Sequence, residues 1–157
     1  IKISKDNFKS ADTVVLASGT NSADALAASS LATSKSAPIL LTKRNEIGKN
    51  VFDEIKRLNA NNVIVVGGKV SISEKVVSDL KNKNITVKRL AGDNRYETSY
   101  EIAKELLKSN KAKEAIIVNG FKNVDALSVS SLATKENLLL QKKDLLAHNV
   151  EIMIVMK

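Results

Sequence analysis

The sequence predicts an α/β fold, in which a mainly parallel sheet is flanked by helices in a Rossmann-like three-layer arrangement built from tandem repeats. Short β-branched runs alternate with segments whose apolar residues recur at helical spacing. The connections between these segments are short, which favours right-handed βαβ units and a parallel sheet. Part of the pattern also recurs further along the chain, which indicates tandem repetition.

Four stretches of the first part of the chain are predicted to be strands. Each is a short apolar run bounded by turn-forming residues, the pattern of a strand that is buried on both faces. A proline at the start of one run suits a strand, because proline has no N–H to give to the ladder. The four predicted strands are Thr13 to Ala17, Pro38 to Leu41, Val63 to Val66, and Ile85 to Leu90.

The helices are predicted from amphipathic spacing and from capping residues. Ser71 with Glu74, and Asn94 with Glu97, have the three-residue spacing of a capping box. Residues 1–12 are polar with a weak apolar pattern, and we interpret them as the end of a segment that this sequence lacks. The predicted helices are Ala23 to Thr33, Val51 to Leu58, a segment from Ser71 to about Lys81, and Tyr96 to Leu107.

A repeat is visible at an offset of 101 residues, the separation of Gly19 from Gly120. At this offset Asp24-Ala-Leu26 recurs as Asp125-Ala-Leu127, and the run from Ser30 to Thr33 recurs from Ser131 to Thr134. A strand from Val14 to Leu16 is also echoed, by Ile116 to Val118. A strand–turn–helix unit is therefore expected to occur twice.

The two copies are incomplete in different ways, which sets the predicted domain boundaries. Residues 1–88 form a first repeat without its opening helix, and residues 89–157 form a second, partly degenerate or truncated repeat. The second copy has Asn137-Leu-Leu-Leu140 without a proline, and its final strand, Ile152 to Val155, is not followed by Gly-Gly. We expect the helix after Arg95 to fill the place left empty in the first copy.

Composition limits the classes of function. The chain of 157 residues has a formal net charge of +8, which favours anionic partners. Aromatic residues make up 3% of the sequence, too few for a platform that stacks bases or sugars. The absence of cysteine excludes disulfides, thiolate metal sites and cysteine nucleophiles. No apolar run is long enough to cross a membrane, so no membrane insertion is predicted.

No catalytic group, metal site or cofactor is predicted. His148 is the only histidine, and Asp24 and Asp125 are each expected to sit in the first turn of a helix, where a carboxylate is stabilising. Gly67-Gly68-Lys69 lacks the spacer and the Lys-Ser/Thr pair of a phosphate loop. The two glycines nevertheless follow a predicted strand, at the edge where open α/β sheets bind ligands.

One decapeptide carries a family resemblance. Arg89-Leu-Ala-Gly-Asp-Asn-Arg-Tyr-Glu-Thr98, followed by a helix, is similar to the opening signature of the type-two cell-wall-binding repeat. This repeat occurs in tandem in clostridial S-layer proteins and related surface proteins of Gram-positive bacteria. The Asp-Ala-Leu segments, the Pro38-Ile-Leu-Leu41 strand and Val66-Gly-Gly68 match further parts of the family pattern, so the resemblance covers most of the chain.

The resemblance implies a noncatalytic anchoring module, secreted and held in the cell wall or S-layer. Its partner would be an anionic secondary wall polymer, such as a teichoic acid-like polymer, and further repeats would join it in a pseudo-threefold assembly. The Pro-Ile-Leu-Leu motif is implicated in polymer binding. The expected binding residues are therefore Pro38, Ile39, Leu40, Leu41, Arg95 and Tyr96.

Two other functions remain open from the residues alone. A Rossmann-like nucleotide-binding or enzymatic domain would need a phosphate loop or a paired acid and base, and the sequence offers neither. A nucleic-acid-binding domain would suit the basic charge, but aromatic residues and a recognition-helix motif are lacking, so no nucleic-acid partner is predicted.

Overall fold

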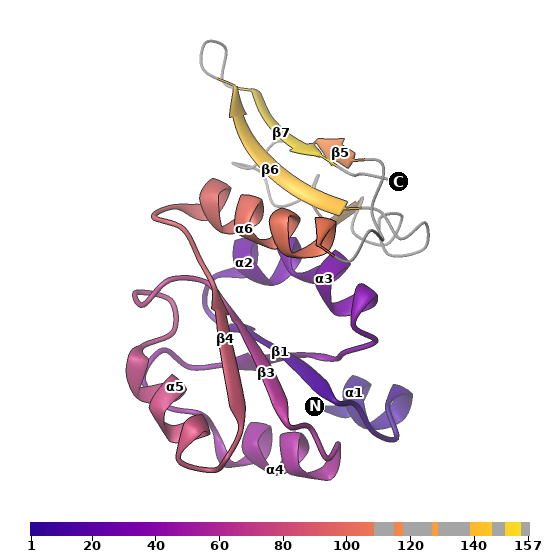
Figure 1. Ribbon diagram of the computed structural model, residues 1–157, viewed down its shortest axis with the longest axis vertical. Coiled ribbons are helices and arrows are strands. Elements are labelled where there is room, and N and C mark those ends of the chain that lie inside the picture. The colour runs from indigo at the N-terminus through magenta and orange to yellow at the C-terminus, as the bar shows by residue number, and fades with distance from the viewer. Residues whose placement is uncertain (109–114, 118–126, 129–138, 146–149, 155–157) are drawn as a thin grey trace.

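The computed structural model of the chain describes residues 1–108, 115–117, 127–128, 139–145 and 150–154. It contains two sheets, with a layer of helices between them (Figure 1). Asp125, the segment from Ser131 to Thr134, and His148 lie outside the described residues.

The larger sheet has four strands in the order β2-β1-β3-β4, and every neighbouring pair is parallel. The predicted parallel sheet is thus confirmed, and each strand agrees with its predicted range to within a residue or so. Strands β1 and β3 are almost fully buried, whereas β2 and β4 form the edges. The bounds are β1 Thr13–Ser18, β2 Ile39–Thr42, β3 Asn62–Val66 and β4 Thr86–Leu90.

Helices cover both faces of this sheet, because successive strand residues point to opposite sides. Val14 and Leu16 of β1 enter one apolar cluster, together with α4 (Lys49–Arg57) and α5 (Glu74–Lys81). Val15 enters the other cluster, on the face covered by α2, α3 and α6. The helices of this second face are α2 Ser22–Ala27, α3 Ser29–Ser34 and α6 Arg95–Leu107.

The single helix predicted from Ala23 to Thr33 is divided in two at Ala28. The hydroxyl of Ser29 donates to the carbonyl of Leu26 at 2.8 Å and competes with the helical ladder there. Backbone bonds from Ala28 to Asp24 and from Ala32 to Ala28 continue across the break. Both short helices therefore pack on the same face of the sheet on either side of Ala28.

The capping box predicted at Ser71 is wrong. Helix α5 begins at Glu74, and its N-cap, Ser73, makes no capping bond through its side chain. The backbone N–H groups of Ser71 and Ile72 donate instead to the carbonyl of Gly68, each at 3.0 Å, and form a turn. This turn buries the Ile72 side chain completely, and that burial decides the local structure.

The N-terminal residues form a helix that the sequence pattern did not predict, α1 (Lys2–Asn7). Its Ser4 hydroxyl donates to the carboxylate of Glu54 in α4 at 2.7 Å. The guanidinium of Arg57 donates to the same carboxylate at 2.8 Å and 2.9 Å, and to the carbonyl of Phe8 at 2.9 Å. These bonds tie α1 to α4 around a buried carboxylate.

Helix α6 belongs to the core of the first sheet, although it follows all four of its strands in the chain. Its residues Ile102, Ala103 and Leu106 are buried in the same cluster as β1, β3 and α3. Lys88 of β4 lies 2.6 Å from Glu105 of α6, and its hydrogen bond holds the pKa of that carboxyl below its usual value. Helix α6 therefore packs on the sheet formed by residues of the first copy.

The smaller sheet repeats part of the larger one. Strand β5 (Ala115–Ile117) pairs in parallel with β6 (Leu139–Leu145), and Ile116 lies opposite Leu140. In the first sheet Val15 lies opposite Ile39, which is the same pairing moved by the repeat offset of 101 residues. The predicted recurrence therefore holds for this pair of strands.

The last strand departs from the repeat. Strand β7 (Val150–Ile154) pairs antiparallel with β6, whereas the first sheet is parallel throughout. Only residues 146–149 separate β6 from β7, and a parallel crossover requires about a dozen residues or more. A hairpin is the connection that this length permits.

Candidate functional site

A cleft of about 450 Å³ lies at the carboxyl edge of the four-stranded sheet. Three segments build it, and each follows a parallel strand: the turn after β1, the Gly67-Gly68 turn after β3, and the segment between β4 and α6. Ligands of open α/β sheets bind at this edge, where the strands end and the helices begin. The residues that line the cleft include Asn21, Asp24, Lys69, Asp93, Asn94, Arg95 and Thr98.

The floor of the cleft is fixed by contacts around Gly67. Gly67 has a φ of +110°, and a β-carbon there would lie 2.6 Å from the buried carboxylate of Asp24. Its N–H donates to the carbonyl of Leu90 at 3.0 Å, and its own carbonyl accepts from Arg89 at 2.7 Å. The Gly67 N–H is therefore committed to the end of β4 and does not point a free donor into the cleft.

The wall of the cleft is the start of α6, where the predicted cap is confirmed for Asn94. The side-chain oxygen of Asn94 accepts from the N–H groups of Tyr96 at 2.9 Å and Glu97 at 3.0 Å. Glu97 in turn accepts from the N–H of Asp93 at 2.8 Å. Gly92 donates to the Thr98 hydroxyl at 3.1 Å, and a β-carbon at Gly92 would meet the Glu97 backbone.

The cleft lining carries both cationic and anionic side chains. Lys69 and Arg95 are exposed at its rim, Asp24 is buried at its floor and Asp93 is exposed. Histidine is absent from the cleft lining, and the described part of the chain contains no group of acidic and histidine side chains that could hold a metal ion. The lining thus combines two cationic side chains with two carboxylates.

The six residues predicted to bind polymer do not come together in one place. Arg95 lines the carboxyl-edge cleft, whereas Tyr96, the next residue, is half-buried at the start of α6 and is outside that lining. Pro38, Ile39 and Leu41 line a different cleft of about 300 Å³, between β2, α1 and α4.

The four residues of the Pro-Ile-Leu-Leu segment have unequal environments. Leu40 is 1% exposed in the core beside α4 and α5, whereas Leu41 is 53% exposed at the end of the edge strand. Ile39 packs on the opposite face, and the carbonyl of Pro38 accepts from Val15 at 3.0 Å. The expectation that Ile39 to Leu41 are all buried thus holds for Leu40 but is wrong for Leu41, and Ile39 is only half-buried.

Sequence reasoning did not single out Lys69, Asn21 or Thr98 as site residues. Each becomes a lining residue only because parallel strands bring their carboxyl ends to one edge. The signal that could have identified them was their position in the chain. Lys69 follows β3, Asn21 follows β1, and Thr98 lies early in α6.

Comparison with known proteins agrees with this architecture. The model of the family "Cell wall binding domain 2 (CWB2)" matches residues 1–77 and 89–155. The chain belongs to this family. Among solved structures, Cwp6 from Clostridium difficile is 38% identical with a TM-score of 0.80, and Cwp8 from the same organism is 33% identical with a TM-score of 0.81. The chain covers 22% and 24% of these proteins, and 87% of it is matched in each comparison.

Two curated relatives are proteins of Bacillus subtilis (strain 168). The N-acetylmuramoyl-L-alanine amidase LytC is 36% identical over 135 residues, and the amidase enhancer is 35% identical over 143 residues. These matches cover 86% and 90% of the chain, but only 27% and 20% of the two relatives. The chain therefore spans about a quarter of the length of these relatives. As a member of the CWB2 family, it associates with the cell wall.

The part of the chain that the structure describes contains no helix that is long and apolar enough to cross a membrane.

Proposed function

We propose that this CWB2 chain is a noncatalytic anchor that holds a secreted protein in the wall or S-layer by binding an anionic secondary wall polymer. Membership of the CWB2 family carries the wall-binding part of this proposal. The net charge of +8 supports an anionic, teichoic acid-like polymer as the ligand, and Lys69 and Arg95 are the cations that the carboxyl-edge cleft offers to it.

The cleft would bind the polymer through its rim. Lys69 and Arg95 supply positive charge, and Asn94 and Thr98 add polar groups on the α6 side. Lys69 is only loosely paired, with its ammonium 3.8 Å from Glu74. An exposed Lys69 can therefore turn toward a passing phosphate or carboxylate without disturbing the fold.

The Pro38 to Leu41 segment is proposed as a second contact surface, either for polymer or for a neighbouring repeat. Leu41 supports this role, because a large apolar side chain at 53% exposure on an edge strand contributes little to the core. We propose that Tyr96 contributes to polymer binding only through the exposed part of its half-buried ring at the start of α6. In a pseudo-threefold assembly with further repeats, the edge strand β2 would lie at such a contact.

The boundaries of the repeats are also part of the proposal. Residues 1–88 and 89–157 are proposed as two repeat units, with α6 packed on the first unit while its sequence opens the second. This arrangement explains why the first unit is complete in its packing although it lacks an opening helix of its own.

The test is co-sedimentation of the chain with purified Gram-positive cell walls. The double substitution Lys69→Gln with Arg95→Gln should reduce the affinity for walls about tenfold, because it removes both rim charges. Lys2→Gln with Lys9→Gln removes the same charge from exposed positions outside the cleft and should have a smaller effect. Equal affinities for the two double variants would show that net charge alone, and not this cleft, directs binding.

A further inference from the structure

The carboxyl-edge cleft is balanced in charge, although the chain as a whole is strongly basic. Its lining holds two cationic side chains, Lys69 and Arg95, and two carboxylates, Asp24 and Asp93. The net charge of +8 draws the chain toward a polyanion from a distance. At close range, however, a lining without net charge gains little from a ligand that carries only negative charge. What the cleft selects therefore depends on which of its charges the fold leaves open.

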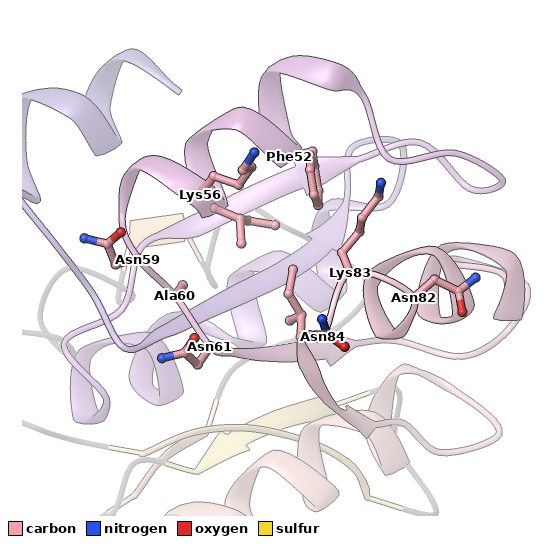
Figure 2. Close-up of a pocket in the computed structure, with 10 residues that line it drawn as sticks. Phe52, Lys56, Asn59, Ala60, Asn61, Asn82, Lys83 and Asn84 are labelled. Atoms are coloured by element: carbon pink, nitrogen blue, oxygen red, sulfur yellow. The ribbon is translucent and has the colours of Figure 1, made fainter.

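This balance is not shared by the cleft at the opposite, amino edge of the same sheet (Figure 2). That cleft lies between the outer side of α4 and the loops that lead into β3 and β4. The ammonium groups of Lys56 and Lys83 lie 6.0 Å and 5.9 Å from the centre of its Phe52 ring, and no acidic residue lines it. Carboxylates in the lining thus distinguish the carboxyl-edge cleft.

The carboxylate of Asp93 is not used by the fold. Asp93 lies just before the N-cap of α6, but the side-chain oxygen of Asn94 already accepts from the N–H groups of Tyr96 and Glu97. Glu97 supplies the negative charge of the first turn and accepts from the N–H of Asp93 at 2.8 Å. The exposed Asp93 carboxylate itself has no hydrogen-bond or ion-pair partner among the described residues. Capping of α6 therefore does not account for it.

Lys69 is the open cation of the cleft. Its ammonium group lies 3.8 Å from the carboxylate of Glu74, which is also 3.4 Å from the guanidinium of Arg89. Glu74 therefore keeps a cationic partner when the exposed Lys69 side chain moves to a ligand.

Lys69 and Asp93 stand on adjacent turns of the cleft. These turns follow the neighbouring parallel strands β3 and β4. They approach closely, since a β-carbon at Gly68 would lie 3.9 Å from the carbonyl oxygen of Gly92. No ion pair joins Lys69 to Asp93 in the described structure, so the two charges do not neutralise each other. One cation and one anion are thus available to the same ligand.

We propose that the carboxyl-edge cleft selects polymer units that carry both a phosphate and an ammonium group. Lys69 binds the phosphate and Asp93 binds the ammonium group, each through charge-assisted hydrogen bonds. A purely anionic unit meets Asp93 as an uncompensated like charge, which disfavours it. The inference rests on the proposed binding of wall polymer and narrows the class of polymer.

The test is co-sedimentation with purified Gram-positive walls before and after treatment with acetic anhydride. N-acetylation removes the positive charge of free amino groups and leaves the phosphates, so the walls become more negative. The chain should nevertheless bind acetylated walls about fivefold more weakly, because Asp93 loses its partner. Binding that is unchanged or stronger after acetylation would overturn the inference and leave the proposed function standing. No binding to untreated walls would overturn both.

Matched variants assign the effect to the cleft. Asp93→Asn should bind treated and untreated walls with affinities within about twofold of each other, because the group that senses the ammonium is gone. Asp6→Asn removes an exposed carboxylate outside the cleft and should keep the full loss on acetylation, as should Lys83→Gln in the amino-edge cleft. A full loss in Asp93→Asn as well would place the ammonium elsewhere and contradict the inference. Circular dichroism reports whether each variant is folded.

Competition with small molecules tests whether both charges act on one unit. Phosphoethanolamine should displace the chain from untreated walls at a concentration several-fold lower than inorganic phosphate or ethanolamine, since it alone carries both groups. Equal displacement by phosphoethanolamine and phosphate would contradict the selection of units with both charges.

Discussion

Single residues show where the fold is most sensitive, and Glu54 is the clearest case. Its carboxylate is 1% exposed and accepts hydrogen bonds from Arg57 and Ser4. The bonds from Arg57, above all, lower the pKa of Glu54 from 4.5 to about 2. A carboxyl group with a lower pKa in the folded state adds stability above its unfolded pKa. That stability is lost as the pH falls.

Urea unfolding at several pH values tests this effect. The free energy of unfolding should fall as the pH drops through 4.5 toward 2, and Glu54→Gln should remove part of this fall. At pH 7, Glu54→Gln should lower the free energy of unfolding by about 1 to 3 kcal/mol, since charge-assisted hydrogen bonds are lost. Glu46→Gln, which removes an exposed ion pair with Lys43, should change little. An unaltered acid-side slope in Glu54→Gln would contradict the assignment.

Gly67 and Gly68 form a matched pair of neighbours with different constraints. Gly67→Ala forces a side chain onto a φ of +110° and against the Asp24 carboxylate, so it should destabilise by about 1 to 3 kcal/mol. At Gly68 an added β-carbon would have its nearest contact at 3.9 Å, so Gly68→Ala should be tolerated. Thermal melting of the two variants checks the difference, and equal melting temperatures would refute the close approach at Gly67.

At the scale of elements, strand β2 separates a packing role from a surface role. Leu40 is in the core, so Leu40→Ala should destabilise by about 2 to 5 kcal/mol. Leu41 is exposed, so Leu41→Ala should leave the melting temperature nearly unchanged while weakening wall retention if this strand binds polymer or another repeat. Melting followed by circular dichroism, together with wall co-sedimentation, measures both effects. Retention unchanged in both Leu41→Ala and Pro38→Ala would remove the segment from the binding surface.

Helix α6 is predicted to be essential to the first sheet. Ile102 is fully buried in the cluster with β1 and α3, so Ile102→Ala should destabilise by about 2 to 5 kcal/mol. Leu107→Ala, five residues later, changes a side chain that is 42% exposed and should have a much smaller effect. Urea unfolding of both variants provides the comparison. Equal losses would mean that α6 does not complete the core of residues 1–88.

The elements that the sequence predicted well are those whose patterns depend on local burial. The runs that became β1 and β3 are apolar because both their faces are covered, and this signal is independent of connectivity. Helix α1 and strand β7 depend on distant partners instead. The first depends on the Glu54 carboxylate across 50 residues, and the second on the short connection after β6. A local pattern contains neither constraint.

At the scale of the whole molecule, the sheet topology decides which residues can act together. The carboxyl-edge cleft joins segments after β1, β3 and β4, and Arg95 was the one predicted binding residue to fall in it. The place of Lys56 and Lys83 beside Phe52 was not predicted, because they were two among many scattered lysines in the sequence. Strand order brings them to one ring, which sequence spacing alone does not reveal.

The central claim is that the chain holds to walls through an anionic polymer, and binding to intact and stripped walls tests it most directly. Purified walls are divided, and one half is treated with hydrofluoric acid to remove phosphodiester-linked polymers. We expect the chain to co-sediment with intact walls at about 0.05 M NaCl and to be released as the salt approaches about 1 M, because screening shortens the reach of its charges. Stripped walls should retain little protein. Equal retention on stripped and intact walls, unaffected by salt, would contradict the claim.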